Sequence, residues 1–268
     1  MFGRRADGVR VRELSTLRRF MPFISPQRNQ SLVYFSQEVD VEAALELLDL
    51  FNRDRPSERR LTLFHLLLRA LVRVLDERPR LNRFVAGGRL WQRDDIWITF
   101  GAKKRLDEQA PLVTVKLKLD PQASLETMLD QVHAALQERR SERKDGAERE
   151  MEWLLRLPSP LLRLGIGCVR ALDALGLLPA AMLRSDPMYA SVFVANLGSV
   201  GLDAGYHHLW EYGTIPIFCV LGRVRAGADG RRRVVLKYTY DERTEDGLYC
   251  ARSLEILREL LEKPSLLV

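Results

Sequence analysis

The sequence predicts a single α+β domain over residues 1–268, in which a mixed β-sheet is flanked by helices. Segments with the two-residue period of strands are interspersed with segments that have the 3.6-residue period of helices. Several of the expected strands pair in antiparallel fashion, and the chain has no internal repeat and no low-complexity tract. A mixture of this kind favours an α+β architecture.

Alternation of apolar and polar residues predicts the strands. Over residues 112–119, Val113, Val115 and Leu117 share one face, so this strand is expected to bury one side. Residues 32–39 alternate in the same way. Further strands are expected at residues 84–86, 90–92, 96–102, 192–195, 215–222 and 234–240.

Helical spacing of apolar residues predicts the helices. Asp40 is a good N-cap for a helix at residues 41–51. A second helix begins at Thr62, and its apolar residues are dense enough to predict burial on more than one side. Residues 1–26 are expected to be irregular, with one short helical turn. The remaining helices are expected at residues 124–143 and 247–262.

Residues 150–186 form an apolar insertion that is expected to be helical and is interrupted by prolines at positions 158, 160 and 179. Three interpretations stay open. The insertion is a helical hairpin packed on the domain or in a subunit contact, a lid over a ligand pocket, or a helix on a membrane surface. The last rests on arginines that flank the apolar faces: Arg156, Arg163, Arg170 and Arg184.

The composition narrows the class of protein. The net charge is +6, but basic and acidic residues are interleaved, which argues against nucleic acid as a partner and suits a small anionic ligand. Three widely spaced cysteines predict neither a metal site nor a disulfide framework. No signal-peptide pattern and no apolar run of about 18 residues occurs. A cytoplasmic location is therefore expected.

Four short motifs occur in order along the chain: Leu14-Ser15-x-x-Arg18-Arg19, Pro79-Arg80-Leu81-Asn82, Asn196-Leu197-Gly198-Ser199-Val200-Gly201 and Asp241-Glu242-Arg243-Thr244-Glu245-Asp246-Gly247. Together they resemble the catalytic domain of the dihydrolipoamide acyltransferases of 2-oxoacid dehydrogenase complexes, whose relatives include chloramphenicol acetyltransferase. The last motif of that family reads D-H-R-x-x-D-G.

The resemblance implies a chloramphenicol acetyltransferase-like two-layer fold. Because active sites of the family lie between subunits, it also implies a homotrimer, with higher assembly as a further option. No lipoyl or peripheral-subunit-binding module is recognised in these 268 residues, so a freestanding catalytic-domain homologue is expected. No covalently bound cofactor is expected, and the implied substrate is a coenzyme A thioester.

The catalytic position of the family is changed here. Its histidine takes the proton from the thiol of coenzyme A or dihydrolipoamide, and Glu242 stands at that place. An exposed glutamate has a pKa of about 4.3, roughly four units below that of a thiol, so it is a poor base unless burial raises its pKa.

The oxyanion position is changed as well. The family places a serine or threonine hydroxyl just before the N-L-G motif, where this chain has Ala195. Alanine cannot donate a hydrogen bond, and loss of one oxyanion donor typically lowers the rate by about 10²–10³. Asn196, Gly198 and Ser199, together with Ala195, mark the expected substrate-binding turn.

The other end of the catalytic motif is retained. Asp246 and Gly247 match the family pair that orders the catalytic loop, in which the aspartate bonds an arginine. By position, Arg18 or Arg19 is the expected partner of Asp246.

Two adjacent histidines, His207 and His208, lie in the aromatic segment 206–212 together with a carboxylate. One interpretation is an aromatic-rich subunit interface. The other is that His207 or His208 supplies a relocated base, oriented by Glu242 as in a histidine–carboxylate dyad.

Three hypotheses for the function follow. The chain is an acyltransferase that uses an acyl-CoA-type thioester with altered catalytic residues. Alternatively, it is a catalytically silent trimeric scaffold or thioester-binding homologue. The third hypothesis is a membrane- or acyl-chain-associated protein that acts through residues 150–186.

Overall fold

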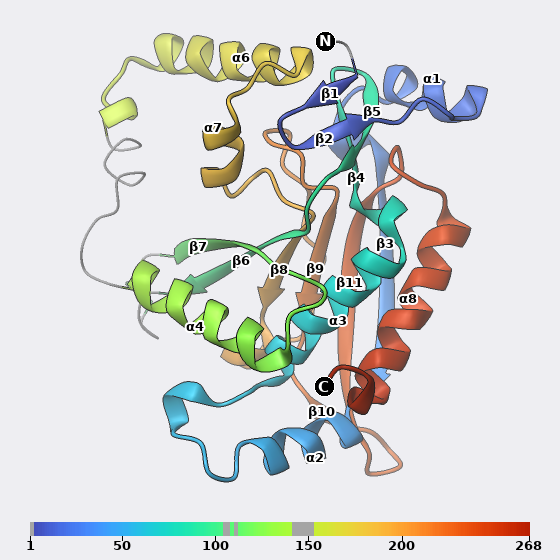
Figure 1. Cartoon of the computed structure of the whole chain (residues 1–268), viewed down its shortest axis with the longest axis vertical. Coiled ribbons are helices and arrows are strands. Elements are labelled where there is room, and N and C mark those ends of the chain that lie inside the picture. The colour runs from blue at the N-terminus through green and yellow to red at the C-terminus, as the bar shows by residue number, and fades with distance from the viewer. Residues whose placement is uncertain (1–2, 104–107, 110–111, 141–152) are drawn as a thin grey trace.

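A mixed β-sheet forms the centre of the molecule (Figure 1). The computed structural model describes residues 3–103, 108–109, 112–140 and 153–268. Within these residues the sheet has seven strands in the order β10-β11-β9-β8-β6-β7, with β3 paired to β11. The strands are β3 (Leu32–Asp40), β6 (Trp97–Lys103), β7 (Leu112–Lys118), β8 (Val192–Asn196), β9 (Ile217–Leu221), β10 (Arg225–Ala226) and β11 (Arg232–Asp241).

The sheet is mixed because β8 runs parallel to both β6 and β9, whereas β11 is antiparallel to β9 and β3. The pairing of β3 with β11 extends over the full nine residues of β3. The predicted α+β class with a mixed sheet is thereby confirmed, and each of the expected strands is present with ends shifted by one or two residues.

Helices cover one face of this sheet (Figure 1). Leucines of α3 pack against strand residues of that face, such as Val194 and Leu236, in the main hydrophobic core. Leu66, Leu67 and Leu68 are all buried, so α3 is buried on more than one side as predicted. The helices of this layer are α2 (Glu42–Phe51), α3 (Leu63–Glu77), α4 (Leu125–Arg140) and α8 (Gly247–Glu262). Residues 141–143 of the expected 124–143 helix lie outside the described residues.

The opposite face of the sheet is covered by the irregular segment 201–216. Leu209 and Ile215 of this segment pack on Phe193 of β8 and on Phe218 and Val220 of β9. This second core places the histidine-containing segment directly over the sheet.

The N-terminal segment is more ordered than predicted. A hairpin of β1 (Arg4–Arg5) and β2 (Gly8–Arg10) joins β5 (Arg89–Arg93) and β4 (Arg83–Ala86) in a second sheet. Residues Thr16–Ile24 form helix α1, whose N-cap Ser15 accepts a hydrogen bond from the Arg18 N–H at 3.3 Å. The expectation of an irregular segment was wrong because strands of two or three residues have no readable period, and Pro22 interrupts the helical pattern.

The insertion is helical, as predicted, and residues 150–152 of it lie outside the described residues. It contains α6 (Ser159–Leu175) and α7 (Ala180–Ser185), and each begins beside a proline, which suits a first helical turn. Within α6 no residue is buried. The helix is joined to the body by Asp173, whose carboxylate accepts a hydrogen bond from Arg5 at 2.6 Å.

Among the helices of the described residues, none is both long and apolar enough to cross a membrane.

Candidate active site

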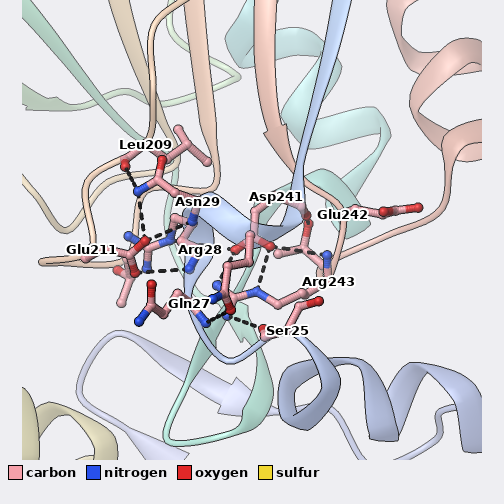
Figure 2. A network of polar contacts seen from close by, with 12 residues as sticks. Ser25, Gln27, Arg28, Asn29, Leu209, Glu211, Asp241, Glu242 and Arg243 are labelled. Atoms are coloured by element: carbon pink, nitrogen blue, oxygen red, sulfur yellow. Dashed lines mark hydrogen bonds and ion pairs between the residues drawn. The ribbon is translucent and has the colours of Figure 1, made fainter.

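The loop 241–247 is built on a buried carboxylate. Asp241, at the end of β11, is 1% exposed and receives two hydrogen bonds of 2.8 Å from the guanidinium of Arg243 (Figure 2). The Nε of Arg28 lies 3.6 Å from Oδ2 of the same carboxylate. Arg243 also donates to the carbonyl oxygen of Pro26 at 2.9 Å. A paired and fully hydrogen-bonded buried charge of this kind fixes the loop in one conformation.

Arg28 connects this loop to the segment on the far face of the sheet. Its guanidinium donates to the carbonyl oxygens of Trp210 and, at 2.8 Å, of Gly213. Burial lowers the pKa of Arg28, and the Asp241 carboxylate counteracts that effect. A buried arginine with carboxylate and carbonyl partners is a structural cross-link.

Glu211 makes a second link to the same segment (Figure 2). Its carboxylate accepts hydrogen bonds from the backbone N–H groups of Arg28 (3.0 Å) and Asn29 (2.8 Å) and from the Asn29 side chain (2.8 Å). Partial burial raises the pKa of Glu211, but these hydrogen bonds outweigh it and hold the pKa below its usual range. The carboxylate of the aromatic segment is therefore used for structure.

Glu242 points out of this network (Figure 2). Its backbone is held, because its N–H donates to Ser31 (2.9 Å) and its carbonyl oxygen accepts from Arg18 (2.5 Å). Its side chain is exposed. Among the described residues, no hydrogen bond or ion pair joins its carboxylate to His207 or His208. The structure therefore gives the predicted dyad no contact within one chain.

Asp246 has a different partner from the one expected. Its carboxylate caps α8 by accepting from the Tyr249 N–H at 2.9 Å, and this hydrogen bond lowers the pKa of Asp246. The nearest paired cation is Arg80, at 3.8 Å. The expected ion pair with Arg18 or Arg19 is not formed, because Arg18 reaches the Glu242 carbonyl instead and Arg19 is exposed.

Gly247 is the first residue of α8. Its φ is not in the left-handed region, and a Cβ there would meet no atom within 4 Å. Neither the backbone nor the space around this position therefore requires glycine in the single chain.

Sequence analysis missed two residues whose side chains anchor the loop 241–247 to the rest of the fold. Glu245 is buried and accepts from Arg80 at 2.6 Å and from Arg83 at 2.9 Å. Arg28 was likewise not singled out. Their partners are more than 160 residues away in sequence, so no local pattern reveals them. The local signal that the sequence did offer is the Asp241-x-Arg243 spacing, which places this ion pair inside the motif.

The N-L-G turn follows β8 and closes on itself. The Asn196 side chain accepts from the Ser199 N–H at 3.1 Å, and the Ser199 hydroxyl donates to the Asn196 carbonyl at 2.8 Å. A Cβ at Gly198 would lie 2.4 Å from the carbonyl oxygen of Gly222, so the turn requires glycine there. Ala195 precedes the turn and packs with the core of the far face.

The two histidines lie on that same face. The ring of His207 stacks on Phe218 with centroids 4.2 Å apart, and its Nδ1 is 2.6 Å from the carbonyl oxygen of His208. Since a carbonyl only accepts, Nδ1 carries the proton and Nε2 is the basic nitrogen. The side chain of His208 is exposed.

Strand register separates Ala195 from Glu242, the two positions that the resemblance marks as changed. Ala195 pairs with Val220, and Val220 pairs with Lys237 of β11. Glu242 lies five residues beyond Lys237, which corresponds to roughly 16 Å along an extended strand. Within one chain, Glu242 and Ala195 therefore do not share a site.

A charged cleft of about 360 Å³ adjoins the N-L-G turn. Lys237 lines it and lies over the ring of Tyr206, with Nζ 4.6 Å from the centroid. The other cations of its lining are Arg223, Arg225 and Arg233, which pair with the carboxylates of Asp203 and Glu38 in the same lining. In the parts of the chain that the structure describes, no cluster of three metal-ligating side chains occurs.

Comparison with solved structures shows the class of this fold. No family model matches the chain, and no curated protein matches it. A probable dihydrolipoamide acetyltransferase from Listeria monocytogenes has a TM-score of 0.57 and 16% identity, with 96% of this chain and 95% of that chain covered. Chloramphenicol acetyltransferase has a TM-score of 0.57 and 15% identity, covering 94% and 95%.

A third solved structure is the cubic core of the pyruvate dehydrogenase multienzyme complex. Its TM-score is 0.59 at 17% identity, and 96% of this chain and 93% of that chain are covered. The chain therefore has the fold of the dihydrolipoamide acyltransferase cores and of chloramphenicol acetyltransferase. The predicted two-layer fold is confirmed.

Proposed function

We propose that this chain is a homo-oligomeric, thioester-binding protein of the acyltransferase fold that is silent at the catalytic position of the family. The observation that carries the proposal is the loop 241–247. Its buried Asp241–Arg243 scaffold is retained, whereas the side chain at position 242 is an exposed carboxylate. As it stands exposed in the single chain, this carboxylate lacks the basicity that a thiol requires.

The oxyanion position supports the same proposal. Ala195 has no donor, and the nearby Ser199 hydroxyl is used by its own turn. A tetrahedral intermediate at this place would therefore lack the fixed hydrogen bond that stabilises it in acyl transfer.

Retained ligand binding is supported by the cleft beside the turn. Coenzyme A carries several phosphate charges, and Lys237, whose ammonium lies over the ring of Tyr206, lines this cleft together with Gly222, which packs against Gly198 of the turn. Cations at a concave site favour such an anion. Homo-oligomeric assembly rests on the fold it shares with the cubic core of the pyruvate dehydrogenase complex.

A rewired acyltransferase is the second candidate, and His207 favours it. The hydrogen bond of its Nδ1 leaves Nε2 as the basic nitrogen, which is the state that a general base requires. His207 would then act without Glu242.

Binding and turnover measured on the same sample test the proposal. We expect acetyl-CoA and longer acyl-CoAs to bind in equilibrium dialysis, and Lys237→Ala to weaken binding about tenfold. Lys263→Ala is the matched control, since that exposed lysine is paired with Glu259 elsewhere. We expect free thiol to be released from the thioesters no faster than in buffer.

Two outcomes would change this conclusion. Absence of acyl-CoA binding by the folded oligomer would refute thioester binding. Thiol release that persists in Glu242→Gln and disappears in His207→Ala would replace the silent homologue by the rewired acyltransferase.

A further inference from the structure

Helix α6 exposes an apolar stripe that the fold does not use. Leu161, Leu164, Cys168, Leu172 and Leu175 recur at steps of three and four residues, so they share one side of the helix. Leu164 and Leu175 are 64% and 68% exposed. On a helix of a globular protein, an apolar stripe of this width normally faces the hydrophobic core.

The contacts of α6 show that this stripe faces away from the body. Asp173 bonds Arg5, and the Ala174 carbonyl oxygen lies so close to Gly87 that a Cβ there would be 2.0 Å from it. At about 100° per residue, both residues lie about 120° or more around the helix from the centre of the stripe. The stripe is thus held outward.

Helix α1 lies at the same end of the molecule as α6 (Figure 1), and it exposes a second apolar stripe. Leu17, Phe20, Phe23 and Ile24 are each more than half exposed. The two helices flank one hairpin tip, because Gly87 meets Ala174 of α6, and a Cβ at the adjacent Gly88 would be 3.3 Å from Phe23 of α1. Two outward apolar stripes therefore border the turn between β4 and β5.

The charges around these stripes are almost all positive. Between α1 and the hairpin lies a groove of about 850 Å³ with several arginines and no carboxylate in its lining. Glu13 is exposed nearby, and Asp173 is neutralised by Arg5. The exposed cations of this end are Arg10, Arg12, Arg19, Arg89, Arg163 and Arg170.

We propose that α1 and α6 dock this protein onto an anionic phospholipid bilayer, with the apolar stripes in the interface and the arginines at the headgroups. A helix with an apolar stripe and a basic remainder binds such surfaces through apolar burial and attraction to anionic lipid. A second copy placed symmetrically on this end would instead bring the six arginines against six more, which opposes association.

Vesicle flotation of the full chain tests this proposal. We expect binding to vesicles of equal parts phosphatidylcholine and phosphatidylglycerol, weak or no binding to phosphatidylcholine alone, and release in high salt because salt screens the headgroup attraction. Leu164→Glu combined with Leu172→Glu should lower the bound fraction at least about tenfold. Both side chains are exposed, so the fold should survive.

A matched control is Leu50→Glu on α2, at the other end of the molecule, where the leucine is also more than half exposed. It should bind vesicles like the unaltered chain. Absence of binding to anionic vesicles, or equal binding by the α6 variant, would overturn the proposal. A loss of oligomer mass in the α6 variant by light scattering would also overturn it, since a second copy would then cover the stripe.

Discussion

Asp241 is the residue on which the candidate site is built. Its carboxylate is shared by Arg243 and Arg28, and all three side chains are buried. Through Arg28 the same carboxylate holds the segment that carries His207 and His208 over the sheet. Position 242 is free of this network, so its side chain can change without disturbing the loop.

Removal of the Asp241 charge should therefore destabilise the fold. Asp241→Asn leaves two buried guanidinium groups without their counter-charge, and such losses cost about 3–5 kcal/mol. Denaturant unfolding at neutral pH measures the effect. The control is Asp203→Asn, since Asp203 pairs with Arg223 at 3.0 Å in an exposed pair worth less than about 1 kcal/mol. Equal losses in the two variants would contradict the structural role.

Individual residues were predicted unevenly. Asp241 and Arg243 could be identified from the motif, because their contact is local. Arg28 and Glu245 could not, since burial and partners distant in sequence give them their roles. The expected pairing of Asp246 with Arg18 or Arg19 failed because the Glu242 carbonyl competes for Arg18.

Among the helices, α3 and α4 meet through two histidines. His65 stacks on His133 with centroids 5.6 Å apart, and its Nδ1 accepts from the Thr62 N–H at 3.1 Å as part of a capping box. Burial, with a smaller contribution from His133, lowers the pKa of His65 to about 4. His65 is buried, and His133 is half-buried against it.

This contact predicts a pH dependence. The folded-state pKa of His65 lies below the unfolded value of about 6.5, so its stabilisation is complete above pH 6.5 and is lost as the pH falls towards 4. Between about pH 7.5 and pH 5, the free energy of unfolding of the unaltered chain should fall by about 2 kcal/mol more than that of the His65→Gln variant. Glutamine is chosen because its amide can still cap α3. Unfolding free energies at both pH values measure this difference.

The exposed His208 provides the control for that experiment. His208→Gln should keep the pH dependence of the unaltered chain. If His65→Gln loses as much stability as the unaltered chain between the two pH values, the histidine contact is not the cause.

Secondary structure was predictable wherever a period extended over several residues. The strands of the large sheet and the helices that cover it follow from apolar alternation and helical spacing. The β1–β2 hairpin was missed because its stability comes from pairing with β5, some 80 residues away. The outward stripe of α6 was visible as an apolar pattern, but its direction depends on the contacts of Asp173 and Gly87.

The whole molecule combines the fold of the acyltransferase cores with different residues at two positions of the resembled motifs. The fold followed from motifs and periodicity together, and the solved structures confirm it. The distance between Ala195 and Glu242 on the sheet did not follow from the sequence, because it is set by the register of β8, β9 and β11. Because of that register, Ala195 and Glu242 lie at opposite ends of the sheet.

The most direct test restores the missing groups. Because positions 195 and 242 do not share a site within one chain, they would meet between subunits of the proposed oligomer, as the resemblance implies. If the loop keeps its catalytic shape there, Glu242→His combined with Ala195→Ser should transfer the acetyl group of acetyl-CoA to a dithiol acceptor at a measurable rate. The unaltered chain should stay at the buffer rate, and Glu242→His alone should fall about 10²–10³-fold below the double variant. Turnover by the unaltered chain that is lost in Glu242→Gln would contradict the silent-homologue proposal, as would a folded double variant without activity.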